Sequence, residues 1–318
     1  MDILQTILYA GLVLIIAGFL AAHVFTRSIA RKVREGVPPR GEFVDVSGGR
    51  LHYVDKGQGR PIVLIHGLSG NLENFGYAMI DRLAEDFRVI AVDRPGCGHS
   101  TRDIDALARL PNQAAMIAEM IETLELDKPL IVGHSLGGAV SLFMALNHPG
   151  QVGGLAMLAP LTAVQETAPS VFKGIDIANP LLRRFIGNTV AIPMSLRQGA
   201  AVLKVVFAPE TPPEDFRTRG GGLLTLRPEA FYAASTDLRS VSLDIADIQP
   251  RYADLACPLG MLYGDGDAVL DHQSHIQAIQ RHHPDMPLVL LEGVGHMPIV
   301  TRPEETHAFI RDMYAKIN

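Results

Sequence analysis

The fold of this chain is indicated most clearly by the segment Leu130-Ile-Val-Gly-His-Ser-Leu-Gly-Gly138. It starts with a short apolar run typical of a buried strand, and the small residues of 139–147 that follow it favour a helix. Between them lies a G-x-S-x-G pattern centred on Ser135. A serine on a sharp strand-to-helix turn needs neighbouring glycines, because side chains there would collide. Its hydroxyl then stands at a helix N-terminus, where N–H groups and the helix dipole favour negative charge. The pattern predicts Ser135 as a nucleophile.

Short apolar runs alternate with longer amphipathic segments on both sides of this turn. A hairpin is predicted for 42–46 and 51–55, around Ser47-Gly-Gly49. The other runs have the pattern of strands buried on both faces, and they are 61–65, 88–92, 130–132, 155–158, 259–263 and 288–291. Strand–helix alternation of this kind predicts an α/β fold with a mostly parallel eight-stranded sheet and helices on both faces.

One interval breaks the alternation. Residues 161–250 are rich in proline and glycine, carry several short helical patterns and show no clear strand. We therefore expect a helical cap at 161–250, inserted into a core that is formed by 42–160 and 251–318.

A serine hydroxyl is a poor nucleophile by itself, so it needs a base and a group that orients the base. Among the twelve histidines, His296 is the best candidate for the base. Its segment, Gly293-Val-Gly-His-Met-Pro298, directly follows the last apolar run. That position lies at the carboxyl edge of the sheet, where open parallel sheets build their sites. The orienting acid is expected in Tyr263-Gly-Asp-Gly-Asp267 or just after it, which leaves Asp265, Asp267 and Asp271 as candidates.

Two backbone N–H groups are predicted to stabilise an oxyanion. Leu136 directly follows the nucleophile. In Ile65-His66-Gly67-Leu68, a turn after a buried strand can direct the N–H of Leu68 toward the same point. His66 itself is expected to be structural.

The N-terminus carries a long apolar run. Residues 3–25 contain no charged side chain, and as a helix they span roughly 34 Å, enough for a hydrocarbon core of ~30 Å. A secretory signal peptide is the alternative, but the basic residues follow the run instead of preceding it. We therefore expect a transmembrane anchor at 1–26 and a linker at 27–41. The catalytic domain is expected on the cytoplasmic side, because Arg27, Arg31, Lys32 and Arg34 come directly after the run.

Composition excludes several classes of protein. The net charge is −6, whereas a protein that binds nucleic acid needs a basic surface. The two cysteines, Cys97 and Cys257, have no metal-site spacing and exclude a disulfide scaffold. Apolar residues make up 47% of the chain and charged residues 19%, which excludes an intrinsically disordered chain.

The order Ser135, Asp267, His296 resembles the α/β-hydrolase fold, as do His66-Gly67, Asp93-Arg-Pro-Gly-Cys-Gly-His-Ser100 and Gly264-Asp-Gly-Asp267. In that family the acid is the last residue of a G-x-x-D pattern, so the resemblance selects Asp267, and it places the oxyanion donors on Leu68 and Leu136. Gly-His-Ser-Leu-Gly is similar to lipases and carboxylesterases. With the N-terminal helix, the chain resembles membrane-anchored, monoacylglycerol-lipase-like hydrolases, which need no cofactor and no metal.

The sequence thus predicts a hydrolase of carboxylic esters that acts on lipid-derived or hydrophobic monoesters through an acyl-enzyme on Ser135. Three alternatives stay open. One is a carbon–carbon bond hydrolase of aromatic ring-cleavage products, which uses a similar triad. Another is a cofactor-free peroxidase or perhydrolase side activity. The third is a catalytically silent binding protein of the same fold.

Overall fold

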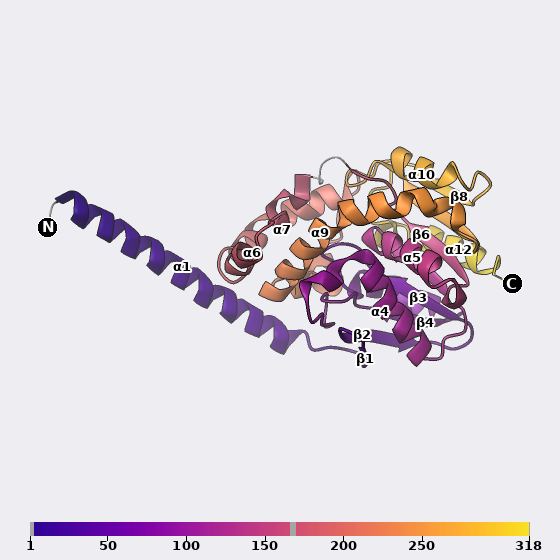
Figure 1. Cartoon of the computed structure of the whole chain (residues 1–318), viewed down its shortest axis with the longest axis horizontal. Helices are drawn as coiled ribbons and strands as arrows, with labels where there is room; N and C mark the ends of the chain where they lie inside the picture. The colour runs from indigo at the N-terminus through magenta and orange to yellow at the C-terminus, as the bar shows by residue number, and fades with distance from the viewer. Residues whose placement is uncertain (1–2, 166–169, 318) are drawn as a thin grey trace.

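The computed structural model describes residues 3–165 and 170–317. Its centre is an eight-stranded sheet with the order β1-β2-β4-β3-β5-β6-β7-β8, in which β2 pairs antiparallel with both neighbours and all other pairs are parallel (Figure 1). The strands are β1 (Glu42–Val46), β2 (Gly49–Lys56), β3 (Pro61–Ile65), β4 (Arg88–Val92), β5 (Leu130–His134), β6 (Gly154–Leu158), β7 (Leu259–Gly264) and β8 (Leu288–Leu291). The predicted mostly parallel sheet is confirmed.

The central strands are buried on both faces because alternate residues point into two separate cores. Ile131 packs with helices α4 (Leu110–Thr123), α5 (Leu136–Asn147) and α10 (His272–Gln280). Leu130 and Val132 face the other core, with α2 (Glu73–Gly76), α3 (Ile80–Leu83), α11 (Pro298–Thr301) and α12 (Pro303–Tyr314). One expectation is wrong: β8 is not buried on both faces. It is the edge strand, and Leu288 and Leu290 are 37% and 49% exposed.

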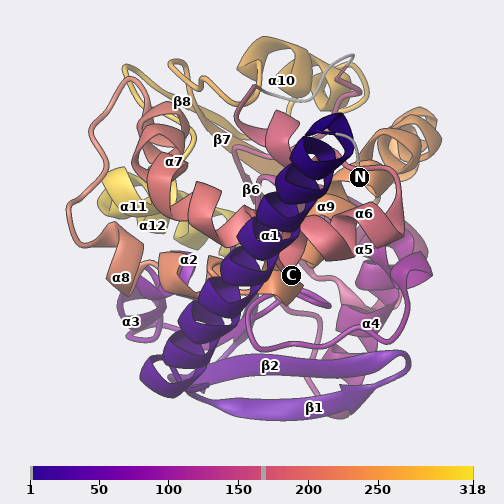
Figure 2. The ribbon, with the colours of Figure 1, turned by 90° about the vertical axis from the view of Figure 1, so that its left-hand side faces the viewer.

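The described residues between β6 and β7 form helices and no strand. They include α6 (Pro180–Gly187), α7 (Ala191–Phe207), α8 (Phe216–Arg219) and α9 (Pro228–Ile248). Figures 1 and 2 show α6, α7 and the start of α9 gathered at the end of the domain that faces the N-terminal helix. We refer to the segment from Leu161 to Pro250 as the cap.

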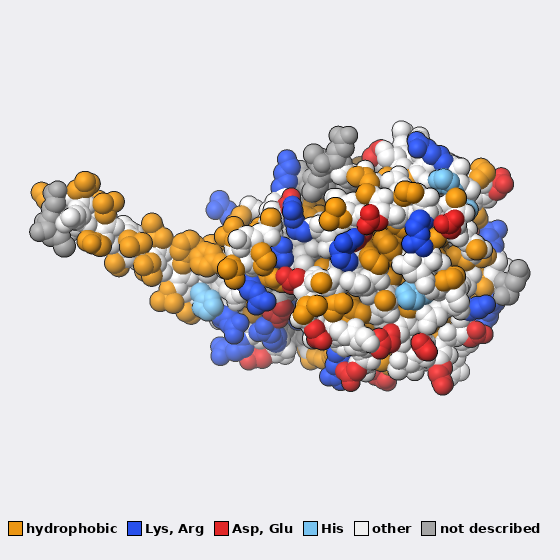
Figure 3. All heavy atoms as spheres, in the orientation of Figure 1, with side chains coloured by type: hydrophobic (Ala, Val, Ile, Leu, Met, Phe, Trp, Pro, Cys, Tyr) orange, Lys and Arg blue, Asp and Glu red, His pale blue; other side chains and the backbone are white. Residues whose placement is uncertain are grey.

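The N-terminal helix α1 (Ile3–Gly36) projects far beyond the domain (Figure 1). It is the one described helix that by itself has the length and composition to cross a membrane, with a mean hydropathy of 2.3 over a window of which 0% is buried. The exposed side chains along it are mostly apolar, and basic groups gather where it meets the domain (Figure 3).

The predicted linker at 27–41 is wrong over most of its length. Helix α1 continues to Gly36, ten residues past the expected end of the anchor, and only 37–41 connect it to β1. The reason is packing: Val33 lies in a small apolar cluster with three cap side chains, Ile192, Leu224 and Leu226. A solvated spacer has no such contacts, whereas the apolar stripe of an amphipathic helix keeps this segment helical.

Candidate active site

Ser135 lies on the turn between β5 and α5, and its backbone is strained. Its φ is 54° and its ψ is −118°, a region that non-glycine residues rarely adopt. The neighbouring glycines permit this turn. A Cβ on Gly133 would lie 2.5 Å from the carbonyl oxygen of Gly137, and a Cβ on Gly137 would lie 2.0 Å from that of Ile65. Strain of this kind costs ~1–3 kcal/mol and is typical of functional sites.

The structure brings Ser135, His296 and Asp267 into one hydrogen-bonded line. His296 Nε2 is 3.0 Å from Ser135 Oγ, and His296 Nδ1 is 2.6 Å from Asp267 Oδ2. The serine follows β5, the aspartate follows β7 and the histidine follows β8, so all three come from the carboxyl ends of strands in the same half of the sheet. The hydroxyl is therefore next to a nitrogen base, and the base is next to a carboxylate.

The loop after β7 gives its three aspartates different partners. Asp267 Oδ2 accepts from His296, while its Oδ1 accepts from the N–H groups of Val269 and Leu270 at 2.8 and 3.0 Å. Asp265 accepts from the N–H of Gly293, and Asp271 caps α10. Only Asp267 contacts the histidine, so the geometry selects it among the three candidates.

The charge of Asp267 is stabilised where it lies. Burial by itself raises the pKa of this carboxyl group, but the charge and hydrogen bond of His296 and the N–H groups of Leu270 and Val269 outweigh burial and lower it. The side chain is 0% exposed. Asp267 is therefore ionised at neutral pH and can stabilise a positive charge on His296.

The two predicted oxyanion donors flank the serine. Leu136 is the first residue of α5 and Leu68 follows β3. Within the described residues, no hydrogen-bond acceptor is found for either N–H. The chain of Gly67 passes close to the serine, since a Cβ on Gly67 would lie 2.9 Å from Ser135 Cβ. The backbone that leads into Leu68 therefore lies beside the serine.

The sequence of this chain matches a known protein family. The sequence profile described as "Alpha/beta hydrolase family" matches residues 62–309. The chain belongs to the alpha/beta hydrolase family. Two of its relatives are named as a lipase and as an esterase, which supports a hydrolase.

Three similar proteins span different parts of the chain. The (E)-2-((N-methylformamido)methylene)succinate hydrolase of Acinetobacter baylyi is 34% identical over 266 residues, which are 80% of this chain and 90% of that protein. A dihydrolipoyllysine-residue acetyltransferase component of the acetoin cleaving system of Cupriavidus necator is 36% identical over 121 residues, but these are only 38% of this chain and 32% of that protein. The crystal structure of a membrane phospholipase A, a bacterial virulence factor, covers 98% of each chain with a TM-score of 0.66 and 22% identity.

A cavity of about 350 Å³ opens above the serine of this alpha/beta hydrolase. Its floor comes from the core, including Leu68, Ser135 and His296. Its walls come mostly from apolar cap side chains, namely Ile186, Met194, Val202, Val206, Leu226 and Phe231. The few polar groups at its side include Asn71, Asn74, Gln198 and Arg217. The cavity is suited to an apolar chain whose reacting carbon reaches Ser135.

The apolar side chains between Leu181 and Met194 differ in their relation to this cavity. Ile186 and Met194 line it. Leu181, Leu182 and Phe185 are instead exposed, and Ile192 packs toward α1. The larger part of the wall, from Val202 to Phe231, was not predicted, because α7 and α9 have no local signal that tells which face covers the site.

Two further residues of the hydrolase were missed. His134 Nε2 donates to the carbonyl oxygen of His296 at 2.9 Å, and burial lowers the pKa of His134 to about 3, so it is a neutral support for the base. Glu210, from the cap, accepts from the N–H of Gly295 at 3.1 Å and from the Thr301 hydroxyl at 2.8 Å. His134 is visible inside the serine motif, whereas Glu210 gives no sequence signal.

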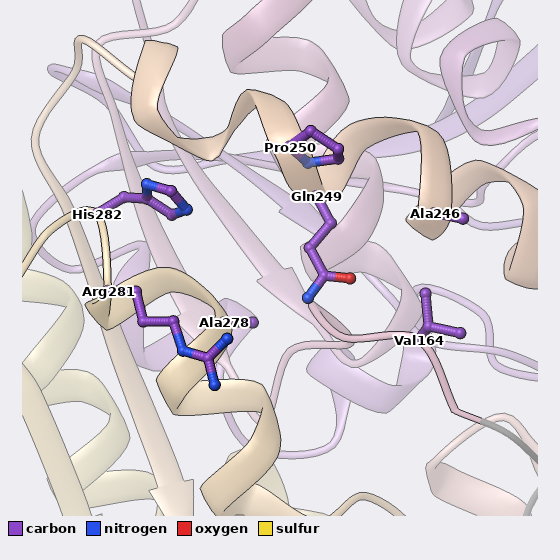
Figure 4. Close-up of a pocket in the computed structure, with 7 residues that line it drawn as sticks. All are labelled: Val164, Ala246, Gln249, Pro250, Ala278, Arg281 and His282. Carbon is purple, nitrogen blue, oxygen red and sulfur yellow. The ribbon is translucent and has the colours of Figure 1, made fainter.

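A second cavity, of about 400 Å³, lies on the surface between α9 and α10. Figure 4 shows its lining, which includes Gln249, Arg281 and His282 and none of the residues of the Ser135 site. Among the described residues there is also no group of three histidine, cysteine or acidic side chains arranged to hold a metal ion.

Proposed function

We propose that this protein is a membrane-anchored serine hydrolase that cleaves carboxylic esters of hydrophobic acyl chains through an acyl-enzyme on Ser135. The observation that carries the proposal is the hydrogen-bonded line from Ser135 through His296 to Asp267 beneath an apolar cavity. The contact between Ser135 and His296 gives the hydroxyl a base, and the contact between His296 and Asp267 orients and stabilises that base.

In the first step the Ser135 oxygen attacks the ester carbonyl while His296 Nε2 takes the hydroxyl proton. The carbonyl oxygen becomes an oxyanion that accepts hydrogen bonds from the N–H groups of Leu68 and Leu136. The intermediate then collapses: the bond to the leaving oxygen breaks, and His296 gives its proton to the departing alcohol. The acyl group stays on Ser135.

In the second step a water molecule takes the place of the alcohol. His296 removes a proton from the water, whose oxygen attacks the acyl carbon, and the same two N–H groups hold the second oxyanion. The acid leaves as Ser135 recovers its proton from His296. Asp267 stays ionised throughout and stabilises the protonated imidazole twice in each cycle.

The lining of the cavity supports a substrate class. The walls facing Ser135 are largely apolar, and a cavity of about 350 Å³ matches a medium-length chain better than a bulky polymer. We therefore propose monoesters or monoacylglycerol-like lipids with an apolar acyl chain of medium length as substrates.

Contacts between α1 and the cap support a membrane location. The rings of Phe19 and Phe185 lie 5.0 Å apart, and His23 contacts the carbonyl oxygen of Asn188 at 3.0 Å. Residues 19 and 23 belong to the apolar run 3–25, so a bilayer that surrounds this run also reaches α6 of the cap. The basic residues after the run support a cytoplasmic catalytic domain.

A second candidate function rests on the relative from Acinetobacter baylyi, which is named as a hydrolase of a substituted succinate. A small dianionic substrate of that kind needs cationic partners, and among the described residues that line the cavity Arg217 is the single Lys or Arg side chain. The apolar walls favour the ester of a fatty chain.

The proposal is tested by Ser135→Ala in the full chain. Removal of one oxygen leaves the fold intact, while labelling by a fluorophosphonate and turnover of an ester chain-length series should both disappear, a loss on the order of 10⁶ in kcat. Faster turnover of a soluble dicarboxylate than of any ester would favour the second candidate. Ester turnover retained by the alanine variant would contradict the proposed nucleophile.

The anchor is tested separately by deleting residues 2–18. This deletion removes exposed apolar residues of α1 but keeps Phe19 and His23, which contact the cap. We expect unchanged turnover of soluble short esters and reduced turnover of an ester embedded in vesicles. An equal loss on both substrates would contradict the anchor.

A further inference from the structure

One carbonyl oxygen next to the site receives an unusual number of hydrogen bonds. Gly67 O lies 2.9 Å from Nδ1 of His66, accepts from Arg94 Nη2 at 3.0 Å, and accepts a longer bond of 3.3 Å from the N–H of Gly70. This oxygen belongs to the peptide group between Gly67 and Leu68. The nitrogen of that same peptide carries the N–H of Leu68.

The contacts of His66 determine which of its nitrogens carries the proton. The backbone N–H of Arg94 points to His66 Nε2 at 2.9 Å, and a backbone N–H can only donate. Nε2 is therefore the acceptor, and the proton is on Nδ1, which donates to Gly67 O. Complete burial and the charge of Arg94 lower the pKa of His66 to about 3, so the ring stays neutral in this arrangement.

Arg94 is held by groups from three directions. It is 0% exposed, and its Nε donates to the carbonyl oxygen of His66 at 3.0 Å. Its Nη1 donates to Gln113 on α4 and to Asp237 on the cap helix α9, at 2.7 and 2.8 Å. Asp237 is itself 0% exposed and also accepts from Arg102 at 2.7 Å. The guanidinium group cannot turn away from Gly67 O without losing its own hydrogen bond to the Asp237 carboxylate, which neutralises its buried charge.

We propose that Arg94 and His66 are positioning residues that fix and polarise the Gly67–Leu68 peptide, so that the Leu68 N–H becomes a stronger donor to the oxyanion. This inference rests on the proposed function. Donors at the oxygen of a peptide withdraw electron density from its nitrogen and strengthen the N–H as a donor, because hydrogen bonds in a chain reinforce one another. They also fix the plane of the peptide, so the N–H is already aligned when the oxyanion forms.

Asp237 gives this arrangement a link to the cap. It comes from α9, whose Phe231 and Ala234 line the substrate cavity. One buried chain of contacts therefore runs from the wall of the cavity through Asp237 and Arg94 to the peptide of the oxyanion donor. Helix α9 therefore does two things: it lines the cavity proposed for the acyl chain, and through Asp237 it holds Arg94 against the Gly67–Leu68 peptide.

Two substitutions of His66 separate this role from simple packing. The amide nitrogen of His66→Asn lies where Nδ1 was, so that variant keeps a donor for Gly67 O. The amide oxygen of His66→Gln lies where Nε2 was, so that variant keeps the acceptor for the Arg94 N–H and loses the donor. Both lose ring packing, and each is thereby a control for the other.

The full chain is assayed in detergent with a soluble ester. We expect kcat of His66→Gln to fall about 10-fold with little change in KM. This is a fraction of the loss caused by removing a whole oxyanion donor. We expect kcat of His66→Asn to stay within about threefold of the value of the unmodified chain. Inhibition by an alkyl trifluoromethyl ketone is the second readout, because addition of Ser135 to this ketone creates an oxyanion. Its inhibition constant should rise in His66→Gln in parallel with the loss of kcat/KM.

Arg94→Lys provides a further variant if either histidine variant is unfolded by circular dichroism. Lysine keeps a charge for Asp237 but lacks the fork of N–H groups that reaches His66 O and Gly67 O together. It should show the same joint loss in kcat and in ketone affinity.

Equal losses in the Asn and Gln variants, or an unchanged inhibition constant where kcat has fallen, would overturn the inference. Failure of the proposed function gives a different result, since the unmodified chain would then lack Ser135-dependent fluorophosphonate labelling.

Discussion

The core and the cap contribute to the same cavity in different ways. The core supplies Ser135, Asp267 and His296, each in a loop directly after a strand, at positions that strand pairing fixes. The cap supplies most of the apolar wall, from Ile186 to Phe231, on helices that pack against the core and against α1. The proposed reacting groups thus lie at the edge of the sheet, and most of the cavity wall belongs to an insertion.

The two regions are nevertheless not independent. Glu210 of the cap holds the N–H of Gly295, next to the proposed base, and it pairs with Arg302. Asp237 of the cap holds Arg94 behind the proposed oxyanion peptide. The cap therefore both lines the cavity and supports loops of the core from outside.

The sharpest test of the core concerns the two neighbouring aspartates. Asp267→Asn keeps the shape but removes the charge that stabilises protonated His296, so kcat should fall by about 10⁴. Asp265→Asn changes only a contact to the N–H of Gly293 and should cost less than about 10-fold. Both variants are measured with one soluble ester, and a larger loss for Asp265→Asn would show that the acid is misassigned.

Acid sensitivity should also come from the core, because the cap segment 161–250 contains no histidine. Burial is the main cause that lowers the pKa of His66 and His134 to about 3 and of His275 to about 4. Their ordinary pKa in an unfolded chain is ~6.5, so between these values the unfolded state binds more protons. Stability is therefore full above pH ~6.5 and decreases as the pH falls, by ~1.4 kcal/mol per pH unit for each such histidine.

Urea unfolding between pH 7 and pH 5 measures this slope. His275→Gln removes one of the three groups, so the slope should decrease by about one proton even though stability at pH 7 is lower. A slope that stays the same in this variant would contradict the assignment of the acid sensitivity to buried neutral histidines.

The cap should control chain length without changing the chemistry. Val202 lines the cavity from α7, and Val202→Phe would fill part of the space for the acyl chain. We expect kcat/KM for a medium-chain ester to fall about 10-fold, or ~1.4 kcal/mol, and that for an acetyl ester to stay within about twofold. Leu243→Phe, at an exposed position of α9, is the matched control. Equal losses on both esters would mean that α7 does not contact the acyl chain.

Substitutions on the outer face of the cap should have the smallest effect on activity, so this face can carry a fluorescent reporter. Leu182 on α6 and Leu290 on the edge strand β8 are both 49% exposed, and the chain contains no tryptophan. Leu182→Trp and Leu290→Trp therefore each introduce a single fluorophore, at a cost to stability within ~0.5 kcal/mol. With the protein in vesicles, brominated lipids should quench the fluorophore at 182 and not the one at 290. Equal quenching at the two positions would contradict contact of α6 with the bilayer.

Local patterns in the amino-acid sequence predicted the sheet and the candidate site residues at its edge. Apolar runs bounded by turn residues predicted six of the strands, and a hairpin around Ser47-Gly-Gly49 predicted the other two. Glycines around Ser135 predicted the strained turn, since the collisions they avoid are local. Asp265, Asp267 and Asp271 stayed equivalent at this level, and only the resemblance to a family distinguished them. Signals confined to a few neighbouring residues were sufficient for all of these predictions.

Only the tertiary structure decided which groups meet across the chain. It placed Asp267 Oδ2, and not Asp265, beside His296, joined Asp237 to Arg94 across 143 positions, and continued α1 to Gly36 against the cap. A carboxylate 143 residues from its arginine leaves no pattern in the sequence, because the pairing depends on how α9 packs on the core. The extra helical turns of α1 depend likewise on the cap side chains that cover Val33. Contacts of this kind exist only once both partners are folded, so spacing along the chain carries no trace of them.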